Sequence, residues 1–89
     1  MKIVLKDRTV EFPEQIYLDQ LIQLDLDKLD KIQNADLKNL NESRDLLKWM
    51  LDFFKVIGIK ERFTIEDLAM MQKDNQLQNW FERLFAGFQ

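Results

Sequence analysis

The spacing of apolar residues changes from a strand pattern to a helical pattern at Pro13, the only proline of the chain. Before it, residues 3–5 form a short apolar run, and residues 9–12 alternate polar and apolar side chains. These two runs predict a β-hairpin that turns at residues 6–8. Proline cannot donate to a strand ladder, so the second strand is expected to end at Pro13.

After Pro13, apolar residues recur at the three-and-four spacing of amphipathic helices. A first helix is predicted over residues 16–24. The polar stretch 25–42 either continues that helix or restarts it, with a loop at 33–36. The predicted apolar face of the first helix consists of Ile16, Tyr17, Leu18, Leu21, Ile22 and Leu24.

The clearest helical pattern covers residues 43–57, where apolar side chains repeat over four turns. Asn41 or Ser43 is the expected N-cap, because short polar side chains accept hydrogen bonds from the first free N–H groups. Gly58 follows the last apolar residue and is expected to adopt the left-handed conformation that commonly ends a helix.

Two shorter helices are predicted toward the C-terminus. Thr64 and Asp67 resemble a capping box and mark the start of one, and Asp74 is the expected cap of the last. Together with the hairpin, these patterns predict a mainly α fold of the α+β class. It is expected to form a single domain over residues 1–89, with a hairpin at 1–13 packed on four to five short helices at 14–89.

Composition excludes several function classes. The chain has no Cys and no His, which removes thiol catalysis, Ser–His triads and zinc sites of the Cys or His type. Thirteen basic residues against sixteen acidic ones give a net charge of -3, so no nucleic-acid role is expected. Neither a membrane-spanning run nor a signal peptide is recognised. We therefore expect a cytoplasmic protein that is not an enzyme and has no cofactor or metal.

Large aromatic side chains concentrate in the last predicted helix. They belong either to the core or to an exposed partner-binding surface, because aromatic residues are enriched at interface centres. Trp49 lies off the apolar stripe of its helix and is a further candidate. The predicted partner-binding residues are Trp80, Phe81, Leu84, Phe85, Phe88 and Trp49.

Two apolar patterns carry a family resemblance. Residues 45–68 contain Asp-Leu-Leu, then Phe-Phe and Phe-Thr-Ile-Glu-Asp-Leu, and residues 77–85 add a Leu, Trp-Phe and Leu-Phe series. These patterns resemble the small tail assembly chaperones of siphophages and related prophages. The resemblance implies a non-enzymatic protein of the host cytoplasm that binds the tape measure protein and tail tube subunits. It also implies a homo-oligomer.

A second interpretation is a small acidic adaptor or regulatory domain, similar in kind to an antitoxin. Such a domain would bind one folded protein partner through the same C-terminal helix. The patterns above do not decide between these two interpretations.

Overall fold

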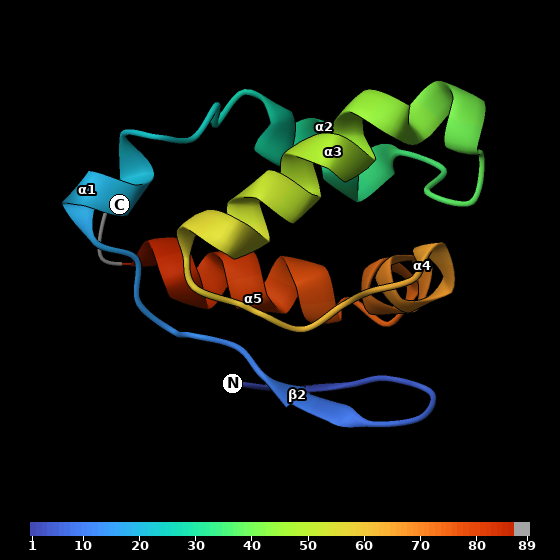
Figure 1. Ribbon diagram of the computed structural model, residues 1–89, viewed down its shortest axis with the longest axis horizontal. Helices are drawn as coiled ribbons and strands as arrows, with labels where there is room; N and C mark the ends of the chain where they lie inside the picture. The colour runs from blue at the N-terminus through green and yellow to red at the C-terminus, as the bar shows by residue number, and fades with distance from the viewer. Residues whose placement is uncertain (87–89) are drawn as a thin grey trace.

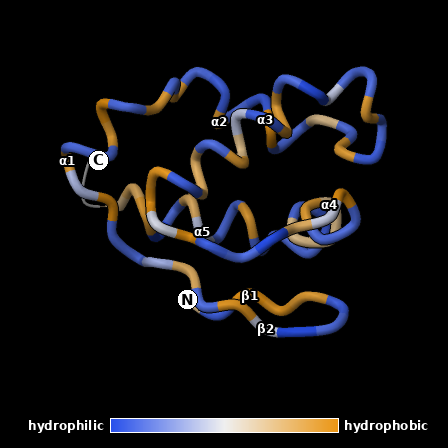
Figure 2. The backbone as a smooth tube through the Cα atoms, in the orientation of Figure 1, coloured by the Kyte–Doolittle hydropathy of each residue, from blue (hydrophilic) through white to orange (hydrophobic). Residues whose placement is uncertain are grey.

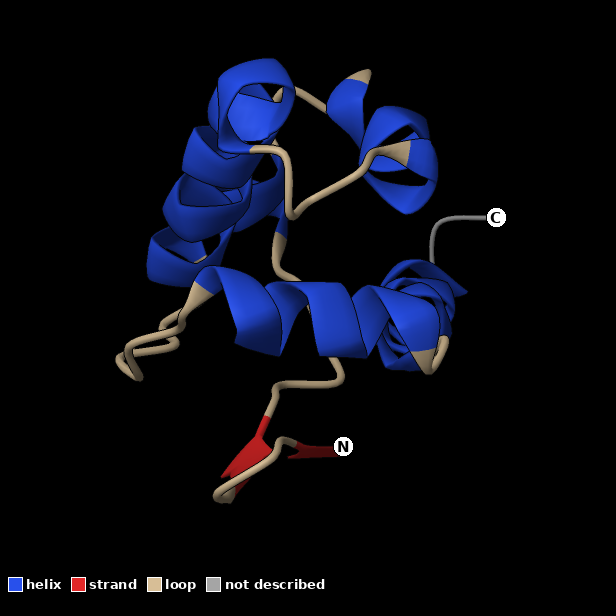
Figure 3. Ribbon diagram, turned by 90° about the vertical axis from the view of Figure 1, so that its right-hand side faces the viewer, coloured by secondary structure: helices blue, strands red, loops and turns tan. Residues whose placement is uncertain are grey.

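The computed structural model describes residues 1–86, which form a two-stranded hairpin followed by five helices. This arrangement confirms the predicted fold class. Figures 1 and 3 show the hairpin at one end of the molecule, α4 and α5 in the middle, and α2 and α3 on the far side. In chain order the elements are β1 (Lys2–Val4), β2 (Thr9–Glu11), α1 (Leu18–Leu21), α2 (Lys28–Asn34), α3 (Leu40–Val56), α4 (Ile65–Lys73) and α5 (Gln76–Phe85).

The hairpin is antiparallel, and Ile3 lies opposite Val10. Both side chains are buried, whereas their neighbours on each strand are exposed; this alternation was predicted for the second strand only. The side-chain amide of Gln76 in α5 accepts from the Val4 N–H (2.8 Å) and donates to the Val4 carbonyl (2.9 Å). It thereby occupies backbone groups that would otherwise be open on the edge strand.

The start of α3 differs from the prediction. The helix begins at Leu40 because Asn39, rather than Asn41 or Ser43, is the N-cap. The Asn39 side chain accepts from a backbone N–H of the first turn (3.4 Å). Ser43 is buried instead, and its hydroxyl donates to the carbonyl of Asp36. This hydroxyl holds the preceding loop against the helix.

The end of α3 confirms the role predicted for Gly58, whose φ is +88°. The Gly58 N–H donates to the Lys55 carbonyl (3.2 Å), and the Ile59 N–H donates to the Phe54 carbonyl (2.8 Å). These two bonds form a Schellman motif. Ile59 and Phe54 are both buried, so the motif turns the chain back over the core.

Gly58→Ala is expected to lower the free energy of unfolding by about 1–2 kcal/mol, because an L side chain is strained at positive φ. No atom lies within 4 Å of the added Cβ, so the cost comes from the backbone and not from a clash. Urea unfolding measures the change. Gly58→Asn should lose less stability, since asparagine tolerates the left-handed region better. An alanine variant as stable as the parent chain would contradict the argument.

The N-terminal ends of α4 and α5 are partly as predicted. Thr64 and Asp67 form the expected capping box, in which each side chain accepts from the other residue's N–H, at 3.1 and 3.0 Å. Asp74, however, ends α4 and does not cap α5. Asn75 takes the N-cap position with φ 60°, a conformation that asparagine tolerates. The two helices can therefore meet in a tight turn.

Residues 25–42 contain α2, the loop that follows it and the start of α3, so this stretch restarts the helix rather than continuing the first one. The loop predicted at 33–36 overlaps the end of α2, which stops at Asn34. The side-chain amide of Gln72 in α4 caps this helix end, where carbonyl groups lack partners within the helix. Its acceptors are the carbonyl oxygens of Ile32 (2.7 Å), Gln33 (3.2 Å) and Ala35 (2.8 Å).

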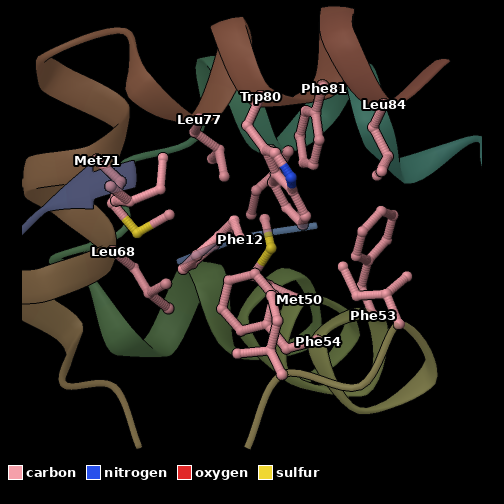
Figure 4. Close-up of a cluster of buried hydrophobic side chains, with 14 of the residues drawn as sticks. Phe12, Met50, Phe53, Phe54, Leu68, Met71, Leu77, Trp80, Phe81 and Leu84 are labelled. Atoms are coloured by element: carbon pink, nitrogen blue, oxygen red, sulfur yellow. The ribbon is translucent and has the colours of Figure 1, made fainter. Parts of the chain in front are cut away.

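The core lies where the hairpin, α3 and α5 meet, and Figure 4 shows its side chains. Phe12 makes edge-on contacts with Phe54, Phe63 and Trp80, with ring centroids 5.5, 5.8 and 4.9 Å apart. Figure 2 shows hydrophobic and hydrophilic residues alternating along α3 and α5, as expected of helices with one face in a core. Phe12, which follows the second strand, thus connects α3 with the segment before α4 and with α5.

Candidate functional site

The side chains predicted to bind a partner lie mostly in the core. Phe85 is half-buried, and Phe88 lies outside the described residues. Because the hairpin and α3 cover this face of α5, the structure favours the core alternative and corrects the assignment of the buried residues to a partner surface. Four of the six are no more than 7% exposed: Trp80, Phe81, Leu84 and Trp49.

Trp80 shows what the last helix does in the fold. The side chain is fully buried, and its indole N–H donates to the carbonyl of Pro13 (2.6 Å). Its ring lies 4.9 Å from that of Phe12 and 5.4 Å from that of Phe53, measured between centroids. Trp80 therefore fastens the end of the hairpin to α5 and α3.

Trp49 is also buried, but it is held differently. Its ring packs on Phe53 with centroids 5.3 Å apart. Among the described residues, its indole N–H has no hydrogen-bond partner. Such a group loses its bond to water on burial and gains none in return. Trp49 thus contributes packing to the core, without a hydrogen bond.

The most exposed large apolar side chains of residues 1–86 lie in α1 and at its two ends. Tyr17, Leu18 and Ile22 are 61%, 68% and 76% exposed, and we call these three side chains the α1 patch. Leu18 and Ile22 are four residues apart and so lie on one side of a helical turn. Large contiguous apolar side chains in solvent mark sites that a partner covers.

The prediction of one amphipathic helix over residues 16–24 did not identify this surface, because α1 is only one turn long. Ile16 is buried, whereas Leu21 and Leu24 are partly buried against the core. A signal was present in the sequence: residues 16–18 are consecutive apolar residues, and at 3.6 residues per turn they cannot share one face. At least one of them had to face outward.

Two contacts hold α1 in place. The N–H of Tyr17 donates to the side-chain carbonyl of Gln20 (2.9 Å), which stabilises the start of the turn. The Gln20 amide then donates to the carbonyl of Val56 at the end of α3 (3.2 Å). Both bonds are made by the Gln20 side chain and by backbone groups. They therefore do not involve the side chains of the α1 patch.

The chain around the α1 patch is purely acidic. Residues 13–27 contain four acidic and no basic side chains. Arg83 donates to Glu14 (2.9 Å) and, with the N-terminal ammonium 3.4 Å away, holds the pKa of Glu14 below its ordinary value. The three remaining acids, Asp19, Asp25 and Asp27, have no basic group of residues 1–86 within salt-bridge distance. They give the segment that carries the patch a negative charge that no ion pair of residues 1–86 compensates.

A second surface feature is a groove of about 590 Å³ beside the end of α3, which we call the 51–63 groove. Its apolar lining includes Leu51, which is 43% exposed. Glu61 is the single acid of the lining, and Arg8 lies 3.6 Å from it. The complete lining is Leu51, Phe54, Lys55, Gly58, Ile59, Lys60, Glu61, Arg62 and Phe63.

Over residues 1–86, no three acidic side chains gather in a way that could hold a metal ion. No helix in the same part of the chain is both long and apolar enough to cross a lipid bilayer. Both surfaces offer apolar contacts. The charged residues near the α1 patch are acidic, whereas those of the 51–63 groove are mainly basic.

Comparison of this chain with protein-family models, curated proteins and solved structures finds no match.

Proposed function

We propose that this chain is a non-enzymatic tail assembly chaperone, which binds the tape measure protein and tail tube subunits while a phage or prophage tail is built. The α1 patch is the observation that carries the proposal. Three large apolar side chains within six residues of the chain are exposed to solvent, on a turn that is itself anchored to α3. A surface of this kind can cover an apolar segment of another protein.

The size of the α1 patch suits reversible binding. Burial of one aliphatic side chain contributes about 1.5–3 kcal/mol, and association costs several kcal/mol in lost freedom. Three side chains therefore give a weak contact, which a chaperone needs in order to release its client. Several copies along one long client would raise the overall affinity without any new contact.

The sequence resemblance to tail assembly chaperones supports the same function independently of the α1 patch. Its pattern at residues 63–68 includes the capping box that opens α4. The absence of His and Cys from the chain supports a role in binding and not in catalysis. The acidic surroundings of the α1 patch favour client segments that combine apolar and basic residues.

Ile22→Asp is expected to weaken client binding at least about tenfold, because the most exposed apolar contact is lost and a charge must be desolvated. The client in this test is a tape measure protein fragment from the phage or prophage that encodes the chain. Titration of the labelled fragment measures the Kd. Since Ile22 is 76% exposed, the melting temperature of the free chain should stay unchanged.

Leu40→Asp is the matched control, because it places the same charge at another exposed apolar position, in the first turn of α3. Its affinity for the fragment should equal that of the parent chain. Equal affinity of the Ile22 variant and the parent chain would place the client site elsewhere. Failure of the parent chain to bind the fragment, together with one-to-one binding of a single folded protein, would instead favour the adaptor interpretation.

A further inference from the structure

The α1 patch and the 51–63 groove are complementary in chemistry. The patch consists of exposed apolar side chains bordered by acids, and the groove has an apolar lining bordered by bases. We infer that the α1 patch of one copy of this chain docks into the 51–63 groove of a second copy. The inference rests on the proposed function only in identifying the same patch as the client-binding surface.

The charges of the two surfaces favour this pairing. Asp19, Asp25 and Asp27 lie within five residues of the patch and have no basic partner among residues 1–86. The groove presents Lys55, Lys60 and Arg62, all three exposed and likewise absent from the ion pairs of the described residues. A patch-to-groove contact therefore brings an acidic segment to a groove whose charged lining is predominantly basic.

The alternative self-contacts bring like charges together. Two α1 patches placed face to face would juxtapose the three acids of each copy, and two grooves would juxtapose the three bases. Both arrangements cost energy, because like charges at an interface repel in a partly desolvated space. The groove's one acid, Glu61, does not change the sign of this comparison, because three basic side chains line the groove against that single acid.

The dimensions of the groove agree with an apolar occupant larger than one side chain. Its volume of about 590 Å³ falls in the range of pockets that enclose a small organic ligand. Leu51 and Phe63 are accessible on its wall, with Phe54 and Ile59 buried behind them. The aliphatic side chains of Leu18 and Ile22 can therefore leave water on docking.

The consequence is competition between self-association and client binding. When no client is present, the groove of a second copy covers the α1 patch and keeps it from non-specific contacts. A client segment that is apolar and basic reproduces the chemistry of the groove and displaces it. Addition of client should therefore release copies of the chain from one another.

A charge-swap experiment tests the inference. The first variant is Asp19→Lys with Asp27→Lys, whose side chains accept no hydrogen bond among the described residues. The second is Lys60→Glu with Arg62→Glu, at two exposed positions. Sedimentation velocity over a concentration series should show association of the parent chain and at least a tenfold weaker association of each variant alone. An equimolar mixture of the two variants should associate again, because each patch then meets a groove of opposite charge.

The matched control is Lys38→Glu with Arg44→Glu, which changes the net charge as the second variant does but at exposed positions outside the groove. It should associate like the parent chain. The inference is overturned if the parent chain stays monomeric, if either swapped variant associates as well as the parent, or if the mixture fails to recover. A monomeric parent chain whose client binding is still lost in Ile22→Asp would overturn this inference and leave the proposed function standing.

Discussion

Trp80→Ala is expected to lower the free energy of unfolding by about 3–5 kcal/mol, as is typical when a large buried aromatic side chain is truncated. Trp80 is fully buried, contacts the rings of Phe12 and Phe53, and donates a hydrogen bond to the Pro13 carbonyl. Small domains have only about 5–15 kcal/mol of stability in total. The variant should therefore have a much lower urea midpoint, and part of it should be unfolded without denaturant.

The two tryptophans provide a matched comparison for this prediction. Trp80→Phe removes the hydrogen bond and leaves the Pro13 carbonyl without its donor, so it should lose about 1–3 kcal/mol beyond the change in packing. Trp49→Phe removes a buried N–H that has no partner among residues 1–86, and should lose less. Equal losses in the two variants would show that the bond to Pro13 contributes little.

Asp67→Ala is expected to lower the free energy of unfolding by about 2–3 kcal/mol, because one buried carboxylate serves both a helix cap and an ion pair. Asp67 is 7% exposed, accepts from the Thr64 N–H (3.0 Å), and lies 3.4 Å from the Arg8 guanidinium. Its loss frees the start of α4 and leaves Arg8, at the hairpin turn, without that acceptor. Urea unfolding measures the change.

Glu66→Ala is the control for Asp67→Ala, since Glu66 is an exposed acid in the same first turn of α4. It removes the same charge near the helix N-terminus but no cap, so its cost should stay near 0.3–1 kcal/mol by the usual size of helix-dipole effects, about a third of the Asp67 loss. A Glu66 variant as unstable as the Asp67 variant would mean that charge, and not the specific hydrogen bonds, stabilises this helix end.

Elements governed by near neighbours in the chain could be predicted from the sequence. The hairpin followed from a short apolar run before a charged turn and an alternating run after it, and the pairing of Ile3 with Val10 confirms it. The Thr64–Asp67 box and the Gly58 turn followed from side chains within a few residues of the helix ends. Even at helix ends, neighbouring polar residues compete: Asn39 displaced Asn41 and Ser43 as a cap, and Asn75 displaced Asp74.

The candidate site could not be predicted in the same way. In the sequence, α5 and residues 16–24 both show the apolar spacing of an amphipathic helix. A thin core cannot cover every such face. In the structure, the α5 face is covered by the hairpin and α3, whereas Leu18 and Ile22 remain in solvent. The basic border of the 51–63 groove was also hidden, because its residues are scattered among acids in the sequence.

The sequence by itself determined the class of fold, the hairpin, the main helices, the end of α3 and the start of α4, because periodicity and capping depend on residues within about four positions of one another. Only the tertiary structure decided which apolar faces are buried. That choice depends on competition for a small core, in which Phe12, Phe53 and Trp80 are buried against one another whereas Leu18 and Ile22 are exposed. The same packing leaves the α1 patch and the 51–63 groove on the surface.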